Sequence, residues 1–210
     1  MKIIEASYSI EKPLDGAEIL KRIEHAGRIC YKSEDRITDE SAENFVRMLI
    51  ERGHESVLEH ESITVRFICD RSISHEIVRH RLASFSQEST RYCNYSGDRF
   101  GRGLTVIKPC FLKEETGAYA SWLTAMHLAN IAYSDMLAEG CTPQEARSVL
   151  PNSTKTEIVM TANLREWRHF LKLRTAKAAH PQMRELTVPL LHELQEWIPV
   201  VFDDIKEDNI

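Results

Sequence analysis

The stretch RHRLASFSQESTRY, residues 79–92, is the most informative part of this 210-residue chain. It holds three arginines, one histidine, three serines and one threonine, and its one carboxylate belongs to Glu88. Arginine presents a planar fork of donors that matches phosphate oxygens, and hydroxyls and successive backbone N–H groups add more donors. Because the net charge of the whole chain is −5, the stretch predicts a local anion site rather than a generally basic surface.

The composition predicts a globular cytoplasmic protein. A hydrophobic content of 42% over this length predicts one domain, residues 1–210, that buries a core without disulfides or metals, with two small domains as the alternative. The five cysteines are scattered and never spaced C-x-x-C, which favours reduced thiols over a disulfide framework or a structural zinc site. No signal peptide and no apolar run of membrane-spanning length is present in the sequence, so no membrane association is expected.

Hydrophobic periodicity predicts more helices than strands and therefore an α+β, or mixed α/β, fold with a small, mainly antiparallel sheet flanked by helices. Helices are predicted over residues 15–31, 38–53, 72–84, 114–139, 142–150 and 164–174, and in a final region that Pro189 interrupts. Strands are predicted over residues 61–70, 104–108 and 154–162. The predicted helix caps are Asp15, Thr38, Ser72 or Ser74, Thr142 in a capping box with Glu145, and Asn163 with Glu166. The acidic tail, with Asp203, Asp204, Glu207 and Asp208, is expected to be solvated or frayed.

Two cationic clusters are candidates for binding an anion, because the chain lacks a P-loop or dinucleotide fingerprint. The first is Arg79, His80 and Arg81, which would fan out around a helix, followed by the donor-rich segment 84–91; the alternative is a solvated basic face and a polar loop. The second is residues 163–184, with six Lys and Arg and a single acid. For Arg174 alone, a cation that complements the helix C-terminus is the better explanation, but its place on the same helix face as Trp167 keeps a ligand role open. Arg165, His169 and Lys172 form a separate polar stripe.

The first cluster has the pattern R-H-R-x2-S-x4-S-x-R, matched at Arg79, His80, Arg81, Ser84, Ser89 and Arg91. This resembles the signature of the flavin-dependent thymidylate synthases. The segments GHESVLEH (53–60), EARSVLP (145–151), NLREWRHFLKLR (163–174) and AHPQMRE (179–185) are similar to further segments of that family. The resemblance thus extends from about residue 50 to residue 185.

The resemblance implies reductive methylation of dUMP to dTMP. It implies 5,10-methylenetetrahydrofolate as carbon donor, NADPH as reductant, FAD as hydride carrier and tetrahydrofolate as product. It also implies a homotetramer whose active sites are shared between subunits, with no nucleic-acid partner and no metal. Arg174 would contact the uracil and stabilise negative charge on the ring, which makes it the candidate catalytic residue.

The other roles follow from the resemblance residue by residue. The residues that would bind dUMP are Glu76, Arg79, Gln87, Glu88, Ser89, Thr90, Arg91, Arg147 and Arg174. The residues that would bind FAD are His54, Ser56, Arg79, His80, Arg81, Gln87, Asn163, Leu164, Arg165 and His169. The chain departs from many members at Glu76, Gln87 and His169, and each replacement keeps hydrogen-bonding capacity.

Cysteine catalysis is not expected. Cys110 is followed by Phe and Leu and is interpreted as a buried structural thiol, and Ser89 has no adjacent base that would make it a nucleophile. Two other functions remain as alternatives. One is a nucleic-acid-binding module that uses the same arginines on phosphates. The other is a metal-dependent hydrolase built on His54, His60, His75 and His80, which lack H-E-x-x-H spacing.

Overall fold

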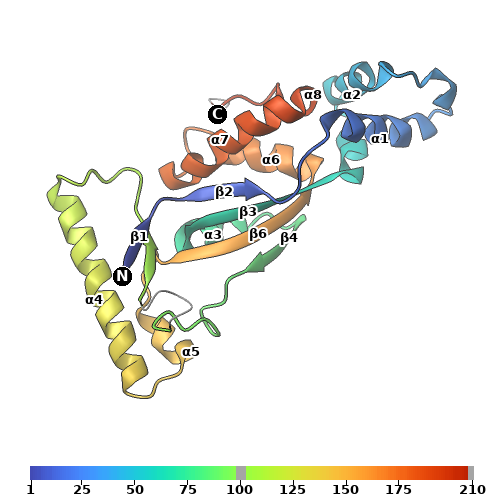
Figure 1. Cartoon of the computed structure of the whole chain (residues 1–210). Coiled ribbons are helices and arrows are strands. Elements are labelled where there is room, and N and C mark those ends of the chain that lie inside the picture. Colours follow the sequence, from blue (N-terminus) through green and yellow to red (C-terminus); the bar gives the residue numbers. More distant parts are fainter. Residues whose placement is uncertain (98–102, 208–210) are drawn as a thin grey trace. The chain divides into compact units, whose positions relative to one another are not determined.

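The structure, a computed structural model, describes residues 1–97 and 103–207 (Figure 1). It divides into two compact units, each described here by itself. Unit 1 comprises Met1–Tyr8, Arg66–Arg79 and Phe85–Val159. Unit 2 comprises Ser9–Val65, His80–Ser84 and Met160–Ile210. The mixed α+β class with a small, mainly antiparallel sheet is confirmed.

The strands form two sheets. The larger has the order β2-β3-β6-β4, and the smaller pairs β1 with β5 in parallel, with Ile3 opposite Val106. The strand bounds are β1 Lys2–Ile4, β2 Ser7–Ile10, β3 Ser62–Asp70, β4 Ala83–Gln87, β5 Thr105–Ile107 and β6 Lys155–Asn163. In β3, Ile63, Val65 and Phe67 are buried and alternate with less buried residues, as a strand with one face in the core requires.

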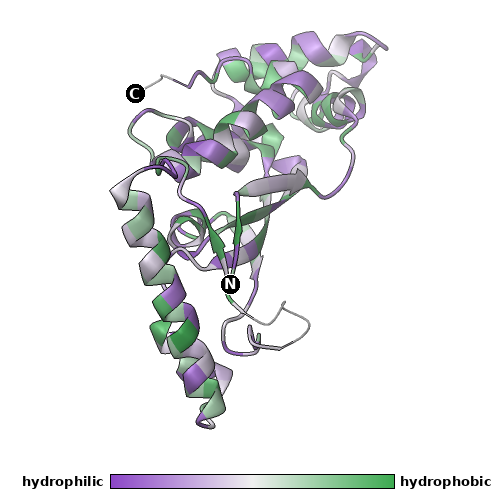
Figure 2. Ribbon diagram, turned by 60° about the vertical axis from the view of Figure 1, so that its left-hand side comes forward, coloured by the Kyte–Doolittle hydropathy of each residue, from purple (hydrophilic) through white to green (hydrophobic). Residues whose placement is uncertain are grey.

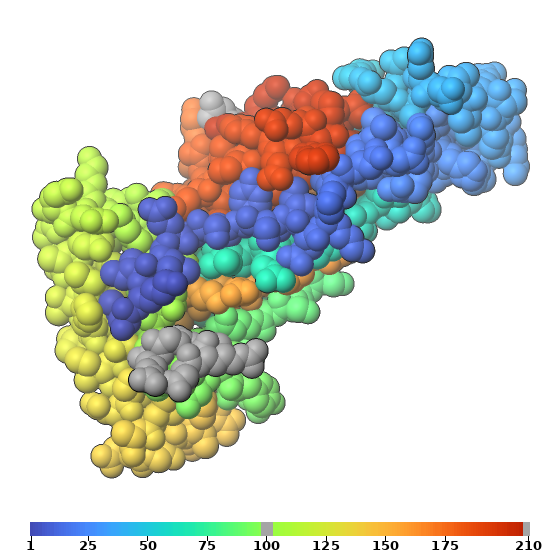
Figure 3. Space-filling model, viewed as in Figure 1, coloured from blue at the N-terminus to red at the C-terminus, as the bar shows by residue number. Residues whose placement is uncertain are grey.

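Most helices of unit 2 bury one apolar face. The helices of this unit are α1 Gly16–Ile29, η1 Glu34–Arg36, α2 Ser41–Glu51, η2 Glu55–His60, α6 Leu164–Arg174, α7 Pro181–Trp197 and α8 Pro199–Phe202. Helices α1 and α2 lie side by side (Figures 1 and 3). Gly27 allows this approach, because a Cβ there would come within 2.7 Å of the Phe45 ring. The absence of a side chain at Gly27 therefore lets the Phe45 ring of α2 pack directly against the backbone of α1.

Helices α6 and α7 supply much of the core of unit 2. Trp167, Phe170 and Leu171 are fully buried, and the indole N–H of Trp167 donates to the carbonyl of Ile63 at 3.0 Å. The prediction that Pro189 interrupts the final helix is wrong, because α7 continues through it to Trp197. The leucines at 186, 190, 191 and 194 are buried along α7. Burying these leucines offsets the loss of one backbone donor at the proline.

Unit 1 contains α3 Arg71–Ile77, α4 Gly117–Ala138, α5 Pro143–Ala146 and η4 Arg147–Val149. One of its core clusters joins Tyr95, Leu104, Tyr133 and Ala146. Helix α4 has 22 residues, but only Met126 and Tyr133 are buried. Figure 2 shows apolar residues along much of its length. Among the described residues, no helix combines the length and the apolar character needed to cross a membrane.

Several helix starts agree with the sequence. Asp15 caps α1 by accepting from the N–H of Glu18 at 3.0 Å. Asn163 caps α6 in the same way, with the N–H of Glu166 as donor at 2.9 Å. The predicted capping box at Thr142 is present, and the Glu145 carboxylate accepts from its N–H at 2.8 Å. Polar residues that precede an apolar run thus located three of the helix starts.

Two boundaries were predicted wrongly. Helix α2 begins at Ser41 with Glu40 at its N-cap, and Thr38 only supplies a carbonyl to the N–H of Ser41. Helix α3 is capped by Asp70 instead of a serine, and it ends at Ile77. The R-H-R residues therefore follow a helix end instead of fanning out around a helix, and part of the expected polar loop is strand β4.

Candidate active site

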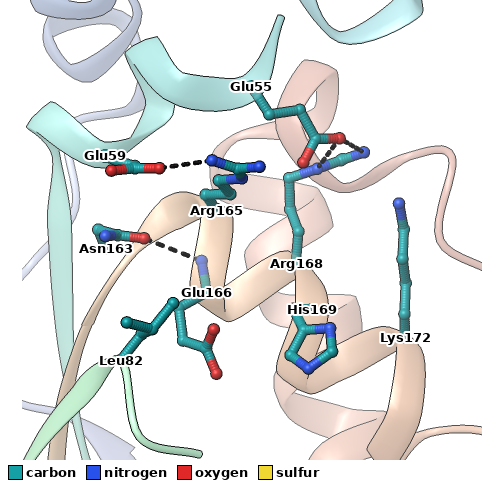
Figure 4. Close-up of a pocket in the computed structure, with 9 residues that line it drawn as sticks. All are labelled: Glu55, Glu59, Leu82, Asn163, Arg165, Glu166, Arg168, His169 and Lys172. Atoms are coloured by element: carbon teal, nitrogen blue, oxygen red, sulfur yellow. Dashed lines mark hydrogen bonds and ion pairs between the residues drawn. The ribbon is translucent and has the colours of Figure 1, made fainter. Parts of the chain in front are cut away.

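Unit 2 contains a half-open polar pocket of about 510 Å³ (Figure 4). Most of its wall comes from one face of α6, where residues three and four apart lie above one another. The lining residues are Glu55, Glu59, Leu82, Asn163, Arg165, Glu166, Arg168, His169 and Lys172. The predicted polar stripe of Arg165, His169 and Lys172 is therefore confirmed as one wall of a cavity.

The cations of this pocket already have carboxylate partners. Arg165 donates to Glu59 at 2.7 Å, and both side chains are about half exposed. Arg168 is 1% exposed and bonds Glu55 at 3.1 Å and Asp204 at 2.6 Å. An exposed ion pair is weak, so a bound phosphate can replace Glu59 as the partner of Arg165 at little cost in free energy. The Arg168 network is buried and is interpreted as structural.

Behind the pocket, three side chains from distant parts of the sequence form a hydrogen-bonded chain. Nδ1 of the buried His80 lies 3.0 Å from a carboxylate oxygen of Glu166. On the other side of the ring, the Nε–H of Arg174 donates to Nε2 of His80 at 3.1 Å. The imidazole also packs edge-on against Phe170 at 4.8 Å and lies 5.6 Å from the ring of His169.

The hydrogen-bonded chain of Glu166, His80 and Arg174 has only one consistent arrangement of protons. The guanidinium of Arg174 can only donate, so Nε2 of His80 must accept, and the imidazole proton must lie on Nδ1 and be donated to Glu166. Burial lowers the pKa of His80, and the charge of Arg174 lowers it further, while the hydrogen bond that His80 donates to Glu166 opposes the shift. His80 is therefore neutral at neutral pH, with its tautomer set by its two neighbours.

The ligating atoms of His80, Glu166 and His169 lie within 4.8 Å of one another, a spacing that a metal ion can bridge. Arg174, however, holds a fixed positive charge against the same imidazole. A second cation beside it would be repelled. We therefore interpret this group as a hydrogen-bonded chain and not as a metal centre.

Glu166 was missed as a site residue. The sequence suggested a role in capping α6 together with Asn163, but its side chain turns to His80 instead. His80 and Glu166 are 86 residues apart, so no local pattern links them. The three predicted residues Asn163, Arg165 and His169 do line the pocket, and Leu164 is fully buried behind it.

The predicted FAD residues of η2 and the R-H-R segment lie outside this pocket wall. His54 and Ser56 are exposed, and Glu55 and Glu59 line the pocket in their place. Arg79, Arg81 and Arg91 are also exposed. Exposed arginine side chains remain hydrated and accessible to a charged ligand.

The predicted dUMP residues of unit 1 gather where β4 ends. Gln87 donates through Nε2 to the hydroxyl of Ser74 at 2.8 Å and to that of Thr156 at 3.2 Å. Arg147 donates to the hydroxyl of Thr90 at 3.4 Å. Arg147 and the turn after β4, which are far apart in the sequence, are thus brought together as the prediction requires.

Glu88 has a different environment from the one expected. Its carboxylate accepts from the hydroxyl of Tyr95 at 2.7 Å and from Lys155 at 2.8 Å. Burial raises the pKa of Tyr95, and the bond to Glu88 raises it further. Burial would lower the pKa of Lys155, but its bonds to Glu157 and Glu88 raise it overall. The side chain of Glu88 therefore helps to hold unit 1 together.

Two further expectations need correction. Cys110 is exposed, not buried, whereas Cys69 is buried and burial raises its pKa to about 12. In the acidic tail, Asp204 pairs with the buried Arg168 and Glu207 lies 2.6 Å from His192, so these residues are tied down. Asp208 lies outside the described residues.

Comparison with known proteins gives the family. The family described as thymidylate synthase complementing protein matches residues 15–200. The flavin-dependent thymidylate synthase of Corynebacterium efficiens is 36% identical over 98% of this chain and 86% of its own length. That of Mycobacterium bovis is 34% identical over 91% of this chain and 81% of its own. A solved structure of the UMP/dUMP methylase PolB from Streptomyces cacaoi, bound with 5-Br dUMP, has a TM-score of 0.77 at 24% identity and covers 97% of this chain and 96% of its own.

The fold and the comparisons thus define a mixed α+β enzyme. The chain belongs to the thymidylate synthase complementing protein family, the flavin-dependent thymidylate synthases. Membership makes it an FAD-dependent methyltransferase. The resemblance inferred from the R-H-R signature is confirmed.

Proposed function

We propose that the protein converts dUMP to dTMP, with 5,10-methylenetetrahydrofolate as carbon donor, NADPH as reductant and FAD as hydride carrier, and releases tetrahydrofolate. The observation that carries this proposal is the chain from Glu166 through His80 to Arg174. It joins the central residue of the R-H-R signature to the arginine assigned to uracil and to a residue of the polar pocket.

In this proposal the polar pocket of unit 2 holds part of the FAD. Asn163, Arg165 and His169 supply an amide, a guanidinium and an imidazole on one wall, and Leu164 contributes backbone. The donor set fits a flavin nucleotide, whose diphosphate is anionic and whose ring and ribose accept hydrogen bonds. His54, Ser56, Arg79, His80, Arg81 and Gln87 complete the proposed FAD set.

The dUMP site in this proposal uses the turn after β4. Ser89, Thr90 and Arg91 offer hydroxyl and guanidinium donors to a phosphate, and Arg147 already lies beside Thr90. Gln87 and Glu88 position this turn through their bonds to Thr156 and Lys155. Glu76, Arg79 and Arg174 complete the proposed set.

Arg174 would activate the uracil. A fixed guanidinium beside the ring stabilises negative charge as N3 ionises, which increases electron density at carbon 5. Donation from its Nε to His80 fixes the plane of the guanidinium, so that less freedom is lost when the substrate binds. When bound, reduced flavin supplies the hydride that completes the methyl group.

The assembly proposed is a homotetramer with active sites shared between subunits, in which residues 1–210 form a single domain. Helix α4 supports self-association, because Leu128 is 62% exposed and Ile131 is 53% exposed on a helix with few buried residues. A cytoplasmic location is also proposed, since all five cysteines are free thiols.

Three measurements test the function. The purified protein should be yellow and show a flavin absorption band. It should form dTMP from dUMP only when NADPH and methylenetetrahydrofolate are both present. Activity that persisted without a reductant would contradict the proposal, and so would a colourless protein that binds RNA with strong salt dependence.

A further inference from the structure

Unit 2 contains a second pocket, of about 620 Å³, on the helical segment from α1 to η2. It is lined by the end of α1, by η1, by one face of α2 and by the residues that lead into η2. Its size suits a small organic ligand. Of the residues that the family signature assigns, His54 alone is among the described lining residues.

The described lining of this pocket contains basic residues and no acidic ones. Arg28, Arg36, Arg52 and His54 line it, and its described lining contains no Asp or Glu. This is notable in a chain with 32 acids and 27 Lys and Arg. Arg52 is the C-cap residue of α2, where a cation also complements the helix dipole. Arg28 and Arg36 likewise lie in the last turns of α1 and η1. The helix dipoles can therefore explain each arginine singly, but not why the three arginines line one pocket.

The three arginines differ in their freedom to bind a ligand. Arg28 is fixed by Glu24, which accepts from its Nε at 3.0 Å and from its NH2 at 2.7 Å. Its guanidinium lies 4.3 Å from the centre of the Phe45 ring, so this side of the pocket is a rigid cationic and aromatic wall. Arg36 and Arg52 are exposed, and they lie at the C-terminal ends of η1 and α2. They are placed to clamp oxyanions as they enter.

A wall of this kind selects a ligand that is both ring-bearing and anionic. Phe45 and Tyr31 offer aromatic surface, and the guanidinium groups offer planar forks to phosphate or carboxylate oxygens. This pocket and the polar pocket are lined by consecutive residues. His54 lines this pocket, and the next residue, Glu55, lines the polar pocket. A ligand held here and extending past His54 would therefore reach the proposed flavin site.

We infer that this second pocket binds the oxyanion-bearing end of a co-substrate, with Arg36 and Arg52 as its specificity residues. The identity of the ligand rests on the proposed function. Two co-substrates carry this chemistry, the phosphates of NADPH and the glutamate carboxylates of methylenetetrahydrofolate. The reacting end of either molecule then lies toward the flavin, and its anionic end lies toward the arginines.

The test compares two doubly substituted proteins that have lost the same charge. The test protein carries Arg36→Ala and Arg52→Ala. The control carries Arg22→Ala and Arg47→Ala, which remove exposed arginines of α1 and α2 that do not line the pocket. Calorimetry with the flavin-loaded proteins measures the affinity for NADP⁺, for NAD⁺ and for 5-formyltetrahydrofolate with one or five glutamates. Steady-state KM values for NADPH, methylenetetrahydrofolate and dUMP follow.

We expect the test protein to bind one of the two co-substrates roughly ten to a hundred times more weakly than the control, the range for lost charge-assisted bonds. A loss that affects NADP⁺ more than NAD⁺ assigns the pocket to the phosphates of the dinucleotide. A loss that grows with the number of glutamates assigns it to the carboxylates of the folate. The affinity for FAD and the KM for dUMP should match those of the control.

Equal affinities of the test and control proteins for all these ligands would overturn the inference. If the test protein folds poorly, Arg36→Gln and Arg52→Gln remove the charge but retain a longer polar side chain than alanine, and they are compared in the same way. Wild-type dTMP formation tests the proposed function separately. Calorimetry requires no turnover, so a failure of the catalytic proposal and a failure of the pocket assignment give different results.

Discussion

At the scale of single residues, the tautomer of His80 is the feature that most constrains the chemistry. Two neighbours define it, since Arg174 must donate and Glu166 must therefore accept. Protonated His80 would present a second donor to Arg174 and break their contact. Glu166 is thus a positioning residue, because it acts on Arg174 through His80.

Replacing Glu166 with Gln tests this role. The amide can turn its NH2 group toward the ring, which favours a proton on Nε2 and sets two donors, that proton and the Arg174 Nε–H, against each other. We expect turnover to fall roughly tenfold to a hundredfold, the scale for loss of a residue that orients a histidine. Nitrogen-15 chemical shifts of His80 should show a mixture of tautomers. Unchanged shifts and unchanged turnover would show that Glu166 is only structural.

Arg174 itself should act on the chemical step. For Arg174→Ala we expect turnover to fall by roughly two or more powers of ten, as when an electrostatic donor is deleted. Arg174→Lys should rescue poorly, because it keeps the charge but loses the planar fork and the Nε donor to His80. The measurement is single-turnover oxidation of the reduced enzyme at saturating dUMP and methylenetetrahydrofolate. A normal rate under these conditions would make Arg174 a binding residue only.

Cys110 is exposed, so its replacement tests whether a thiol takes part in catalysis. We expect Cys110→Ala to keep turnover within about tenfold of the wild type, because arginine-based activation requires no thiolate. The comparison is the turnover number of folded, flavin-loaded protein. A fall of several powers of ten would point to nucleophilic catalysis by cysteine instead.

At the scale of elements, Arg168 connects α6 to η2 and to the segment after α8. Its guanidinium bonds Glu55, Asp204 and the carbonyl of Val201, and it is almost fully buried. Removing one partner of such a network leaves buried charges without compensation. The acidic tail, which the sequence presented as solvated, is therefore part of the fold through Asp204.

Arg168→Ala should lower the free energy of unfolding by about 2–4 kcal/mol, because it removes charge-assisted hydrogen bonds to Glu55 and Asp204 and leaves a cavity where the buried side chain packed. Arg47→Ala is the matched control, because its ion pair with Glu43 is exposed and is expected to contribute about 0–1 kcal/mol. Denaturant unfolding of both variants measures the difference. Similar values for the two would show that the Arg168 network is not stabilising.

The same network predicts an acid dependence. Burial alone would raise the pKa of Asp204, but the hydrogen bond and charge of Arg168 lower it below its ordinary value. A lowered carboxyl pKa contributes stability above the unfolded value, about 3.9, which is lost as pH falls through the folded value. Asp204→Asn should therefore be less stable than the wild type at neutral pH and lose that difference in acid.

The helices and long strands could be predicted from the sequence because their signals are local. Asp15 and Asn163 cap their helices, and alternation marks β3. Helix α3 was misplaced because Asp70 competes with the serines that follow it as a cap. The wall of the polar pocket was predicted from helical spacing on α6. Glu166 could not be predicted, since its partner is 86 residues away and contact between them arises only in the folded chain.

At the scale of the whole molecule, helix α4 presents an exposed apolar surface. Most of its 22 residues are outside the core, and they include the large apolar side chains of Leu128 and Ile131, which are 62% and 53% exposed. These two residues are three apart, so they lie on one face of the helix. Exposed apolar side chains that gather on one face indicate a surface for association with another chain.

Substituting Leu128 and Ile131 together with Glu tests whether this face holds the proposed tetramer together. Two carboxylates cannot be desolvated in an apolar interface without a large cost, whereas on an exposed helix they are tolerated. We expect sedimentation velocity to show smaller species for this variant than for the wild type at the same concentration. Ala17→Glu with Thr38→Glu is the control, because it adds the same charge at exposed positions outside α4 that carry no large apolar side chain. If active sites are shared between subunits, dTMP formation should fall with the loss of the tetramer and recover at high protein concentration. A variant that remained tetrameric and active would exclude α4 as the interface and would leave the shared-site proposal to another surface.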